Sequence, residues 1–242
     1  MPRNLAANPN RVSSPVPEPV GITPVPDDLT AHKAFILAHT RPLAPGHTPE
    51  LKLYQADEVT PLWQLTEEDL GALGVPPPFW AFAWAGGQAL ARYLLDHPET
   101  VAGCRVLDFA TGSGLVAVAA MKAGAASVLA CDIDPYCAAA VPLNAALNGV
   151  FVTFCGDNLL DQSPPLVDVI LAGDVCYEKP MTDRVLEWLG LARSRGTRVL
   201  IGDPGRTYFP REGLTQLARY QVPTTRELED FEIKNCAVWA LP

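Results

Sequence analysis

From residue 104 onward, short apolar runs alternate with helical segments, and this alternation constrains the fold more than any other feature of the sequence. Five runs have the length and apolar content of buried strands, and three of the segments between and after them have the pattern of helices. The predicted strands are 104–109, 127–131, 151–155, 167–173 and 197–202, and the predicted helices are 115–124, 136–147 and 185–191. Runs that are apolar throughout are typical of strands buried on both faces. The sequence therefore predicts an α/β fold, with a parallel sheet and helices on both of its faces.

The last part of the chain departs from this alternation. We expect a helix near residues 211–220, followed by two strands, 227–233 and 234–241, with almost no connection between them. Two such strands can only pair as an antiparallel hairpin. The predicted fold is thus a doubly wound, mostly parallel, Rossmann-like sheet of seven strands that ends in an antiparallel C-terminal hairpin.

The first 103 residues have a different character. A Pro-rich beginning holds seven of the 24 prolines and almost no aromatic or charged residues, which predicts disorder. The segment after it is helical and aromatic. Its predicted parts are a helix capped by Asp27 or Asp28, a short helix near Thr66, the aromatic stretch 76–84 and a helix that follows Gly86-Gly87. The predicted division is a disordered tail (1–27), an N-terminal extension (28–103) and the core domain (104–242).

Composition narrows the classes of function. Asp and Glu outnumber Lys and Arg by 27 to 18, a formal net charge of −9, which argues against nucleic acid as a partner because its phosphates would be repelled. The six cysteines form no C-x-x-C pair and lie mostly in apolar runs, as reduced thiols do. The first residues lack a secretory signal, prolines spoil the helix of a transit peptide, and no stretch has the roughly 20 apolar residues of a membrane span. We therefore expect a cytoplasmic protein that binds neither nucleic acid nor membranes.

A glycine-rich turn, Asp108-Phe-Ala-Thr-Gly112-Ser-Gly114, joins the first core strand to its helix. Such a turn lets a ligand approach the free N–H groups that open the helix. Asp132 ends the second strand, about 20 residues further on, where a carboxylate can accept both ribose hydroxyls of an adenosine. The pattern predicts a nucleoside-type cofactor rather than an empty turn.

The same turn fits two cofactors. Gly112-Ser-Gly114-Leu-Val-Ala117 satisfies the dinucleotide pattern G-x-G-x-x-G/A, so an NAD-dependent dehydrogenase is one alternative. Asp108 disfavours it, because a carboxylate just ahead of the turn would repel a pyrophosphate. S-adenosylmethionine has no phosphate and carries a sulfonium and an ammonium group, which suit the acid. The closing antiparallel hairpin is also unusual for a dinucleotide-binding half.

The turn resembles that of the seven-strand S-adenosylmethionine-dependent methyltransferases, an acidic-x-Gly-x-Gly-x-Gly motif in which Ala110 here replaces the first glycine. Further motifs narrow the resemblance over residues 50–242. They are PPFWAFAWAGGQALARYLLDHP, LDFATGSGLVAVAAMKAGA, CDIDP, GDNL, GDVCYE and IGDPGR. Together they resemble the family of lysine methyltransferases of the electron transfer flavoprotein β subunit, bacterial type. The resemblance implies S-adenosylmethionine as methyl donor and lysines of that protein as acceptors.

The resemblance also implies a set of cofactor-binding residues: Trp84, Asp108, Gly112, Gly114, Asp132, Asp157 and Asn158. The turn residues would border the methionine part of the cofactor, Asp132 the ribose and Asp157-Asn158 the adenine, with Trp84 beside them. Structural roles stay open, because Asp108 also suits the capping of the turn's amides and Asp157-Asn158 suit an ordinary turn. Asp134, before Pro135, is expected to cap a helix.

Asp174-Val-Cys-Tyr177 follows the fourth predicted strand, whose carboxyl end points into the ligand crevice of an open α/β sheet. By spacing alone it reads as a turn followed by core packing. It also matches the D-x-x-Y signature of methyltransferases that modify lysines of non-histone proteins, and this resemblance implies that Asp174 and Tyr177 position the substrate lysine. Asp203 and Arg206, after the fifth strand, are expected on the substrate side. The four histidines lack metal-ligand spacing, so no metal site is predicted.

The expected function is protein-lysine N-methylation of the electron transfer flavoprotein β subunit. One alternative shares the chemistry and acts on another protein, such as a ribosomal one. The NAD-dependent dehydrogenase is an alternative from a different class of enzyme, and a binding module with a dead cofactor pocket is another. The intact acids and glycines of the turn disfavour the binding module.

Overall fold

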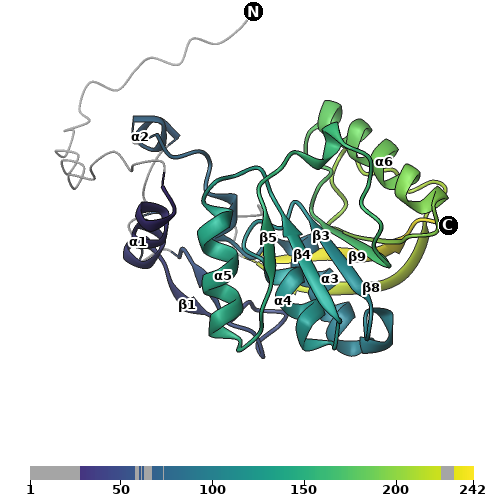
Figure 1. Cartoon of the computed structure of the whole chain (residues 1–242), viewed down its shortest axis with the longest axis horizontal. Helices are drawn as coiled ribbons and strands as arrows, with labels where there is room; N and C mark the ends of the chain where they lie inside the picture. Colours follow the sequence, from purple (N-terminus) through teal and green to yellow (C-terminus); the bar gives the residue numbers. More distant parts are fainter. Residues whose placement is uncertain (1–27, 58–59, 61, 63–66, 73, 225–231) are drawn as a thin grey trace, which may run out of the picture.

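The computed structural model describes residues 28–57, 60, 62, 67–72, 74–224 and 232–242 (Figure 1). The predicted tail, Thr66 and residues 227–231 of the expected strand 227–233 lie outside these residues. Ahead of the core, the chain forms three helices and a small antiparallel sheet: α1 (Leu29–His39), β1 (Arg41–Leu43), β2 (Leu53–Gln55), α2 (Glu67–Ala72) and α3 (Ala85–Asp96). The core follows as β3 (Arg105–Phe109), α4 (Leu115–Lys122), β4 (Ser127–Cys131), α5 (Cys137–Leu147), β5 (Thr153–Cys155), β6 (Val169–Gly173), α6 (Lys179–Ser194), β7 (Arg198–Asp203), β8 (Thr215–Pro223) and β9 (Ile233–Ala240).

Seven strands form the main sheet in the order β5-β4-β3-β6-β7-β9-β8. The first five are parallel, whereas β9 runs antiparallel to β7 and to β8. The chain adds strands outward from β3 in one direction and then returns to add β6 on the other side. Ligands of open α/β sheets bind at such a reversal of strand order, outside the carboxyl ends of the strands. The predicted fold class is confirmed, with its reversal point between β3 and β6.

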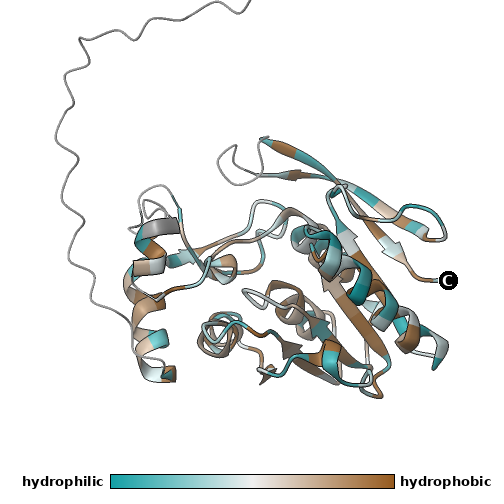
Figure 2. Cartoon of the chain, turned by 90° about the horizontal axis from the view of Figure 1, so that it is seen from above, coloured by the Kyte–Doolittle hydropathy of each residue, from teal (hydrophilic) through white to brown (hydrophobic). Residues whose placement is uncertain are grey.

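The helix expected near residues 211–220 is wrong. Residues 204–214 form a loop, and the chain then enters β8, so the C-terminal hairpin consists of β8 and β9 and its first strand comes earlier than expected. On β8, Ala218, Tyr220 and Val222 alternate toward the buried face, where they pack against the same core as α3. Figure 2 shows these two strands along one edge of the molecule.

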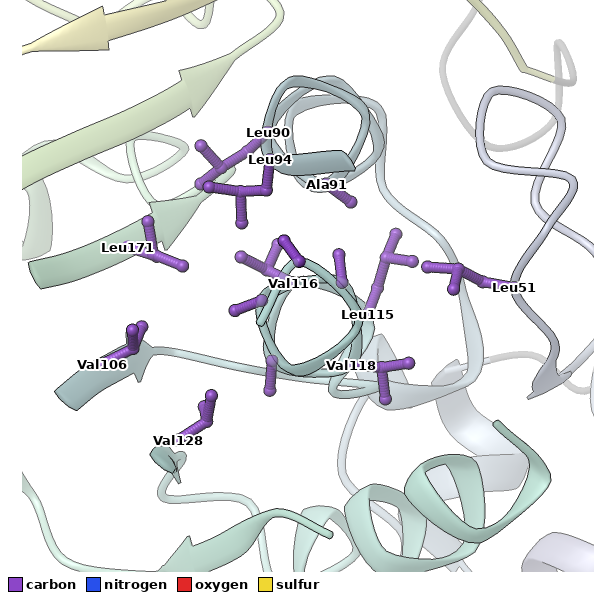
Figure 3. Close-up of a cluster of buried hydrophobic side chains, with 14 of the residues drawn as sticks. Leu51, Leu90, Ala91, Leu94, Val106, Leu115, Val116, Val118, Val128 and Leu171 are labelled. Atoms are coloured by element: carbon purple, nitrogen blue, oxygen red, sulfur yellow. The ribbon is translucent and has the colours of Figure 1, made fainter. Parts of the chain in front are cut away.

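One face of the sheet is covered by α3, α4 and part of α5. Leu90 and Leu94 of α3 meet Val116 of α4 and Leu171 of β6 in a cluster of buried aliphatic side chains (Figure 3). Each such side chain contributes roughly 1.5–3 kcal/mol by leaving water. Leu51, just before β2, joins the same cluster, so the N-terminal extension and the sheet share one core.

The opposite face of the sheet is covered by α6. Its residues Val185, Trp188 and Leu189 have the i, i+3, i+4 spacing of one helix face, and all three are buried against β3, β6 and β7. The Trp188 ring lies 5.2 Å from that of Phe109, and its Nε1 donates to the Gln162 carbonyl at 2.9 Å. These contacts fix the Trp188 ring beneath the end of β3.

A third cluster fixes the N-terminal extension to α5. Asp28 caps α1, because its carboxylate accepts the Ala31 N–H at 2.7 Å, and Phe35 of α1 packs against Trp80 and Tyr136. Trp80 is fully buried and stacks on Tyr136 with ring centroids 5.6 Å apart. The aromatic stretch is therefore anchored beside the carboxyl edge of the sheet.

In the described part of the chain, no helix combines the length and the apolarity that crossing a membrane requires.

Candidate functional site

A cavity of about 320 Å³ opens at the carboxyl edge of the sheet, where the strand order reverses. Its volume lies in the range of small-molecule sites. Eight of the nine residues predicted for the site line it: Trp84, Asp108, Gly112, Asp132, Asp157, Asn158, Asp174 and Tyr177. These residues come from distant parts of the sequence and follow β3, β4, β5 and β6 or precede α3. The structure thus brings the predicted residues together, while their individual roles stay predictions.

Gly114, the ninth, lies just outside the lining. It precedes α4 with φ of +79°, and a Cβ at this position would lie 3.3 Å from a methyl group of Val141 on α5. Its requirement is thus one of backbone shape and helix packing. Gly112 has φ of +51°, and Ala110, which stands where the motif has its first glycine, has φ of +53°. For an alanine this left-handed conformation costs roughly 1–2 kcal/mol.

Asp108 is the penultimate residue of β3, and its carboxyl group is buried. It accepts hydrogen bonds from the Thr111 hydroxyl and, at 2.9 Å, from the Ala117 N–H near the start of α4. Burial raises the pKa of Asp108 to about 7, although both hydrogen bonds oppose this shift. The side chain therefore ties the turn to the helix and also lines the cavity, while its role toward a cofactor stays a prediction.

Asp132, after β4, is held by two backbone donors. Its carboxylate accepts the Gly112 N–H at 2.8 Å and the Asp134 N–H at 3.0 Å, which joins the loops after β3 and β4. Asp134 in turn accepts the Tyr136 N–H at 2.9 Å, and burial raises its pKa to about 6. Asp134 therefore holds the turn that leads into α5, and Asp132 is fixed at the cavity wall.

The loop after β5 combines a turn with a cavity wall. Asn158 accepts the Leu160 N–H at 3.2 Å and donates to Asp161 at 2.8 Å, so it caps a short 3₁₀ helix. Asp157, beside it, is exposed and lines the cavity. Asn158 therefore has the role of an ordinary turn residue, which the sequence analysis left open. The loop also lines the cavity, where a ligand can reach it.

Asp174 follows β6 in a conformation that few residues adopt. Its φ is +61°, its N–H donates to the Gly202 carbonyl at 2.8 Å, and its side chain is buried. One carboxylate oxygen, Oδ2, accepts the Gly86 N–H at 2.7 Å, and Oδ1 lies 2.6 Å from Nε of Arg206. Gly86 is in the first turn of α3, so the positive end of that helix faces the carboxylate.

Three glycines, Gly86, Gly173 and Gly202, allow α3 to approach the sheet this closely. A Cβ on Gly86 would lie 2.5 Å from the Gly202 carbonyl oxygen, and one on Gly202 would lie 2.2 Å from the Gly86 oxygen. A Cβ on Gly173 would lie 2.9 Å from Cα of Gly87. The sequence predicted a helix after the Gly86-Gly87 pair, but α3 begins at Ala85 and includes both glycines. Close backbone contact with β7 explains Gly86.

Aromatic side chains form the outer part of the cavity. Phe79 and Tyr177 are each about half exposed, with ring centroids 6.0 Å apart, and Trp84 lies 5.7 Å from Phe79. Nε1 of Trp84 donates to the Phe79 carbonyl at 2.9 Å, which fixes the indole. Burial raises the pKa of Tyr177, so its hydroxyl stays neutral. Phe79 is a residue of the predicted aromatic stretch 76–84, and its half-exposed ring lines the cavity.

Arg206 is the residue whose importance sequence reasoning underrated. It was expected on the substrate side, and it lines the cavity as an ion-pair partner of Asp174. Asp203, expected there too, is buried beneath the loop and accepts the Gly205 and Arg206 N–H groups at 2.6 and 2.8 Å. The G-D-P-G-R segment after β7 marked this loop, but only the fold brings it to Asp174.

The charge of the cavity favours a cationic ligand. Among the described residues that line it, five are aspartates and one, Arg206, is a basic residue. The aspartates are Asp108, Asp132, Asp134, Asp157 and Asp174. A sulfonium with an ammonium group fits this charge, whereas a pyrophosphate would face several carboxylates. In the described part of the chain, no group of three or more His, Cys, Asp or Glu residues could hold a metal ion.

The strand order, the glycine turn and the acidic cavity at the reversal point define a class: the seven-strand, class I methyltransferases. A solved structure of a putative RNA methyltransferase from Pyrococcus horikoshii has this fold, with a TM-score of 0.50 and 13% identity over 68% of this chain and 88% of that one. A family model described as ribosomal protein L11 methyltransferase matches residues 89–175, which span the cofactor turn.

Two curated relatives match along most of their length. The chain is 37% identical over 225 residues to the electron transfer flavoprotein beta subunit lysine methyltransferase of Xenopus laevis, covering 90% of each chain. It is 39% identical over 220 residues to the protein of that name from Danio rerio, covering 88% of this chain and 83% of that one. The chain belongs to the electron transfer flavoprotein β subunit lysine methyltransferase family.

Proposed function

We propose that this chain transfers methyl groups from S-adenosylmethionine to lysine side chains of the electron transfer flavoprotein β subunit. The observation that carries the proposal is the cavity at the reversal of strand order, which is acidic, of small-molecule size and bordered by Asp174 and exposed aromatic rings. Relatives that match over nearly the whole chain are named for that reaction, which supports the same substrate here.

On the cofactor side, S-adenosylmethionine supplies an electrophilic methyl group on a sulfonium. We assign Asp132 to the ribose hydroxyls, because it stands at the end of β4 with its position fixed by two N–H donors. Asp108 and the Gly112 backbone border the methionine part, Asp157-Asn158 the adenine, and Trp84 a side of the cavity. Gly114 lies outside the cavity lining and contributes the backbone shape of the turn.

On the acceptor side, Asp174 and Tyr177 position the lysine. A lysine amine, with a pKa of about 10.4, must lose its proton before it can attack, and the aromatic opening desolvates it. Asp174 already accepts two hydrogen bonds through its two oxygens, and this rigid placement suits orientation of the amine. Bulk water takes the proton before the amine is captured.

The L11 methyltransferase alternative is favoured by the family-model match. That match spans about a third of the chain and covers α3, the cofactor turn and the strands up to Val175, which methyltransferases for different acceptors share. The loops after β7 and the C-terminal hairpin lie outside it. The match therefore supports S-adenosylmethionine as the methyl donor more than it supports protein L11 as the acceptor.

We place the enzyme in the cytoplasm, with a protein substrate and no nucleic acid. All six cysteines are free thiols, which a reducing compartment maintains, and the acidic balance of the chain repels phosphate backbones. The division into a tail (1–27), an extension (28–103) and a core (104–242) is retained as a proposal. Its test is whether residues 28–242 alone retain activity.

Two binding measurements and one methyl-transfer assay test the proposed function. Calorimetry should show binding of S-adenosylmethionine and none of NAD. With a tritiated methyl donor, label should enter purified electron transfer flavoprotein β subunit and not ribosomal protein L11. Label in L11 alone would assign the enzyme to the alternative acceptor, and binding of NAD alone would return it to the dehydrogenases. Asp174→Ala should bind the donor normally and lose transfer.

A further inference from the structure

The Asp174–Arg206 ion pair joins the loop after β6 to the loop after β7. Asp203 accepts the backbone N–H groups of Gly205 and Arg206, and this turn carries the guanidinium to Asp174. The Arg206 side chain is 23% exposed and that of Asp174 is 6% exposed, so the pair is mostly withdrawn from water. In such surroundings, a charge and its partner interact far more strongly than at an open surface.

Methyl transfer sets a requirement on the charge next to the acceptor. The lone pair of the lysine nitrogen forms the new N–C bond while the C–S bond breaks and its electrons stay on sulfur. A protonated lysine has no lone pair, so its proton must first pass to water. A buried carboxylate without a partner would stabilise the ammonium form and hold the substrate in its unreactive state.

We propose that Arg206 is a positioning residue that balances the charge of Asp174, so that the acceptor site takes lysine as the neutral amine. This inference rests on the proposed function and deepens it. Asp174 keeps its oxygen atoms as hydrogen-bond acceptors for the amine, while the guanidinium removes the net charge that would favour an ammonium ion. Arg206 is also the one basic side chain among the described residues of the cavity lining.

The neighbouring titratable groups define the pH range for a test. Burial raises the pKa of Asp203 to about 6 and that of Cys176 to about 12, and it also raises the pKa of Tyr177. Across pH 7.5–9.5, Asp203 is therefore ionised, the thiol and the phenol are neutral, and Asp108, whose pKa is about 7, is mostly ionised. Among the described residues, the titratable groups that face the pair include Asp203 after β7, Cys176 and Tyr177 after β6, and Asp108 and Asp132 across the cavity; the first turn of α3 contributes N–H groups and no titratable side chain.

The experiment compares Arg206→Gln with wild type and with Arg211→Gln. Arg211 lies in the same loop and is exposed and outside the lining, so its variant makes the same change of charge away from the acceptor. We expect the kcat of Arg206→Gln to be at least tenfold lower than that of wild type at pH 7.5 and to recover as the pH rises to 9.5. This corresponds to a shift of the acid limb of the kcat–pH profile by about one pH unit or more toward higher pH. Arg211→Gln should follow wild type.

A binding measurement supplies a readout without turnover. With S-adenosylhomocysteine in place of the donor, Arg206→Gln should bind the unmodified acceptor protein at pH 7.5 as tightly as wild type or more tightly, because its carboxylate holds the ammonium. A lower kcat with an unchanged or lower Kd is the expected combination. Weaker binding together with an equal loss of kcat at every pH would show that Arg206 is merely structural and would overturn the inference.

A double-variant cycle guards against a folding defect. Asp174→Asn removes the carboxylate charge next to Arg206 and should move the acid limb of its residual activity to lower pH, whereas Asp174→Asn combined with Arg206→Gln should bring the limb back toward wild type. If Arg206→Gln does not fold, the inference is tested by Asp174→Asn alone. An acid limb of Asp174→Asn at the same pH as that of wild type refutes the inference. Failure of wild type to methylate the acceptor would instead refute the proposed function.

Discussion

Replacing Gly86 by alanine tests the close contact that builds the site. The added Cβ would lie 2.5 Å from the Gly202 carbonyl oxygen and 3.0 Å from Asp174 Oδ2, and the nearest obstacle is backbone. The adjacent Gly87→Ala is a matched control, because its Cβ would meet only Val116 at an ordinary 3.9 Å. The two substitutions are one residue apart in the first turn of the same helix.

The expected magnitudes follow from three terms. Alanine in a helix gains up to about 1 kcal/mol over glycine in both variants. In Gly86→Ala, overpacking costs about 1–3 kcal/mol. Displacement of the helix also weakens the 2.7 Å hydrogen bond from the Gly86 N–H to the carboxylate, which is worth about 1.5–3 kcal/mol. Gly86→Ala should therefore lose roughly 2–4 kcal/mol of unfolding free energy, whereas Gly87→Ala should be neutral or slightly more stable.

Thermal and denaturant unfolding of both variants measures this difference. For a chain of this size, 2–4 kcal/mol corresponds to a fall in Tm of about 5–15 °C. Transfer activity of Gly86→Ala should fall with it, because the Asp174 carboxylate loses a donor. Equal stability of the two variants would refute the argument that backbone contact between α3 and β7 requires Gly86.

Three further predictions concern the cofactor turn and its acids. Ala110→Gly should raise the unfolding free energy by up to about 1 kcal/mol, since glycine adopts the +53° φ without strain; a loss in denaturant unfolding would contradict this. Folding raises the pKa of Asp108 from 3.8 to about 7, so this group's contribution to stability is complete below pH 4 and disappears as the pH rises through 7, a change of about 4 kcal/mol. Asp108→Asn should lack that dependence, and parallel slopes of stability against pH for the two proteins would show that the carboxyl does not titrate in this way. Asp132→Ala should weaken S-adenosylmethionine binding at least tenfold in calorimetry, through loss of a charged acceptor, and unchanged affinity would remove Asp132 from the site.

Much of the fold was predictable because the buried parallel strands are apolar throughout and their helices end at glycines. The strand β8 was not, because Leu217 and Tyr220 stand three residues apart and suggest a helix, while the two-residue alternation of Ala218, Tyr220 and Val222 was overlooked. Only the packing of the hairpin against the core under α3 decides between the two patterns.

The candidate site was predictable where one local motif holds the residues, as in the turn from Asp108 to Gly112. It was not where tertiary contact makes the chemistry. Gly86 and Asp174 are 88 residues apart in sequence, and Asp174 and Arg206 are 32 apart, so no spacing rule connects them. Asp174 also has a positive φ and donates its N–H to the Gly202 carbonyl, a contact between residues 28 positions apart.

The most direct test of the central claim is the intact mass of purified electron transfer flavoprotein β subunit after incubation with this enzyme and S-adenosylmethionine. We expect the mass to rise in whole methyl increments with the wild-type enzyme, and to stay unchanged with the Asp174→Ala variant although that variant binds the donor. An unchanged mass with wild-type enzyme that has bound S-adenosylmethionine would contradict the claim.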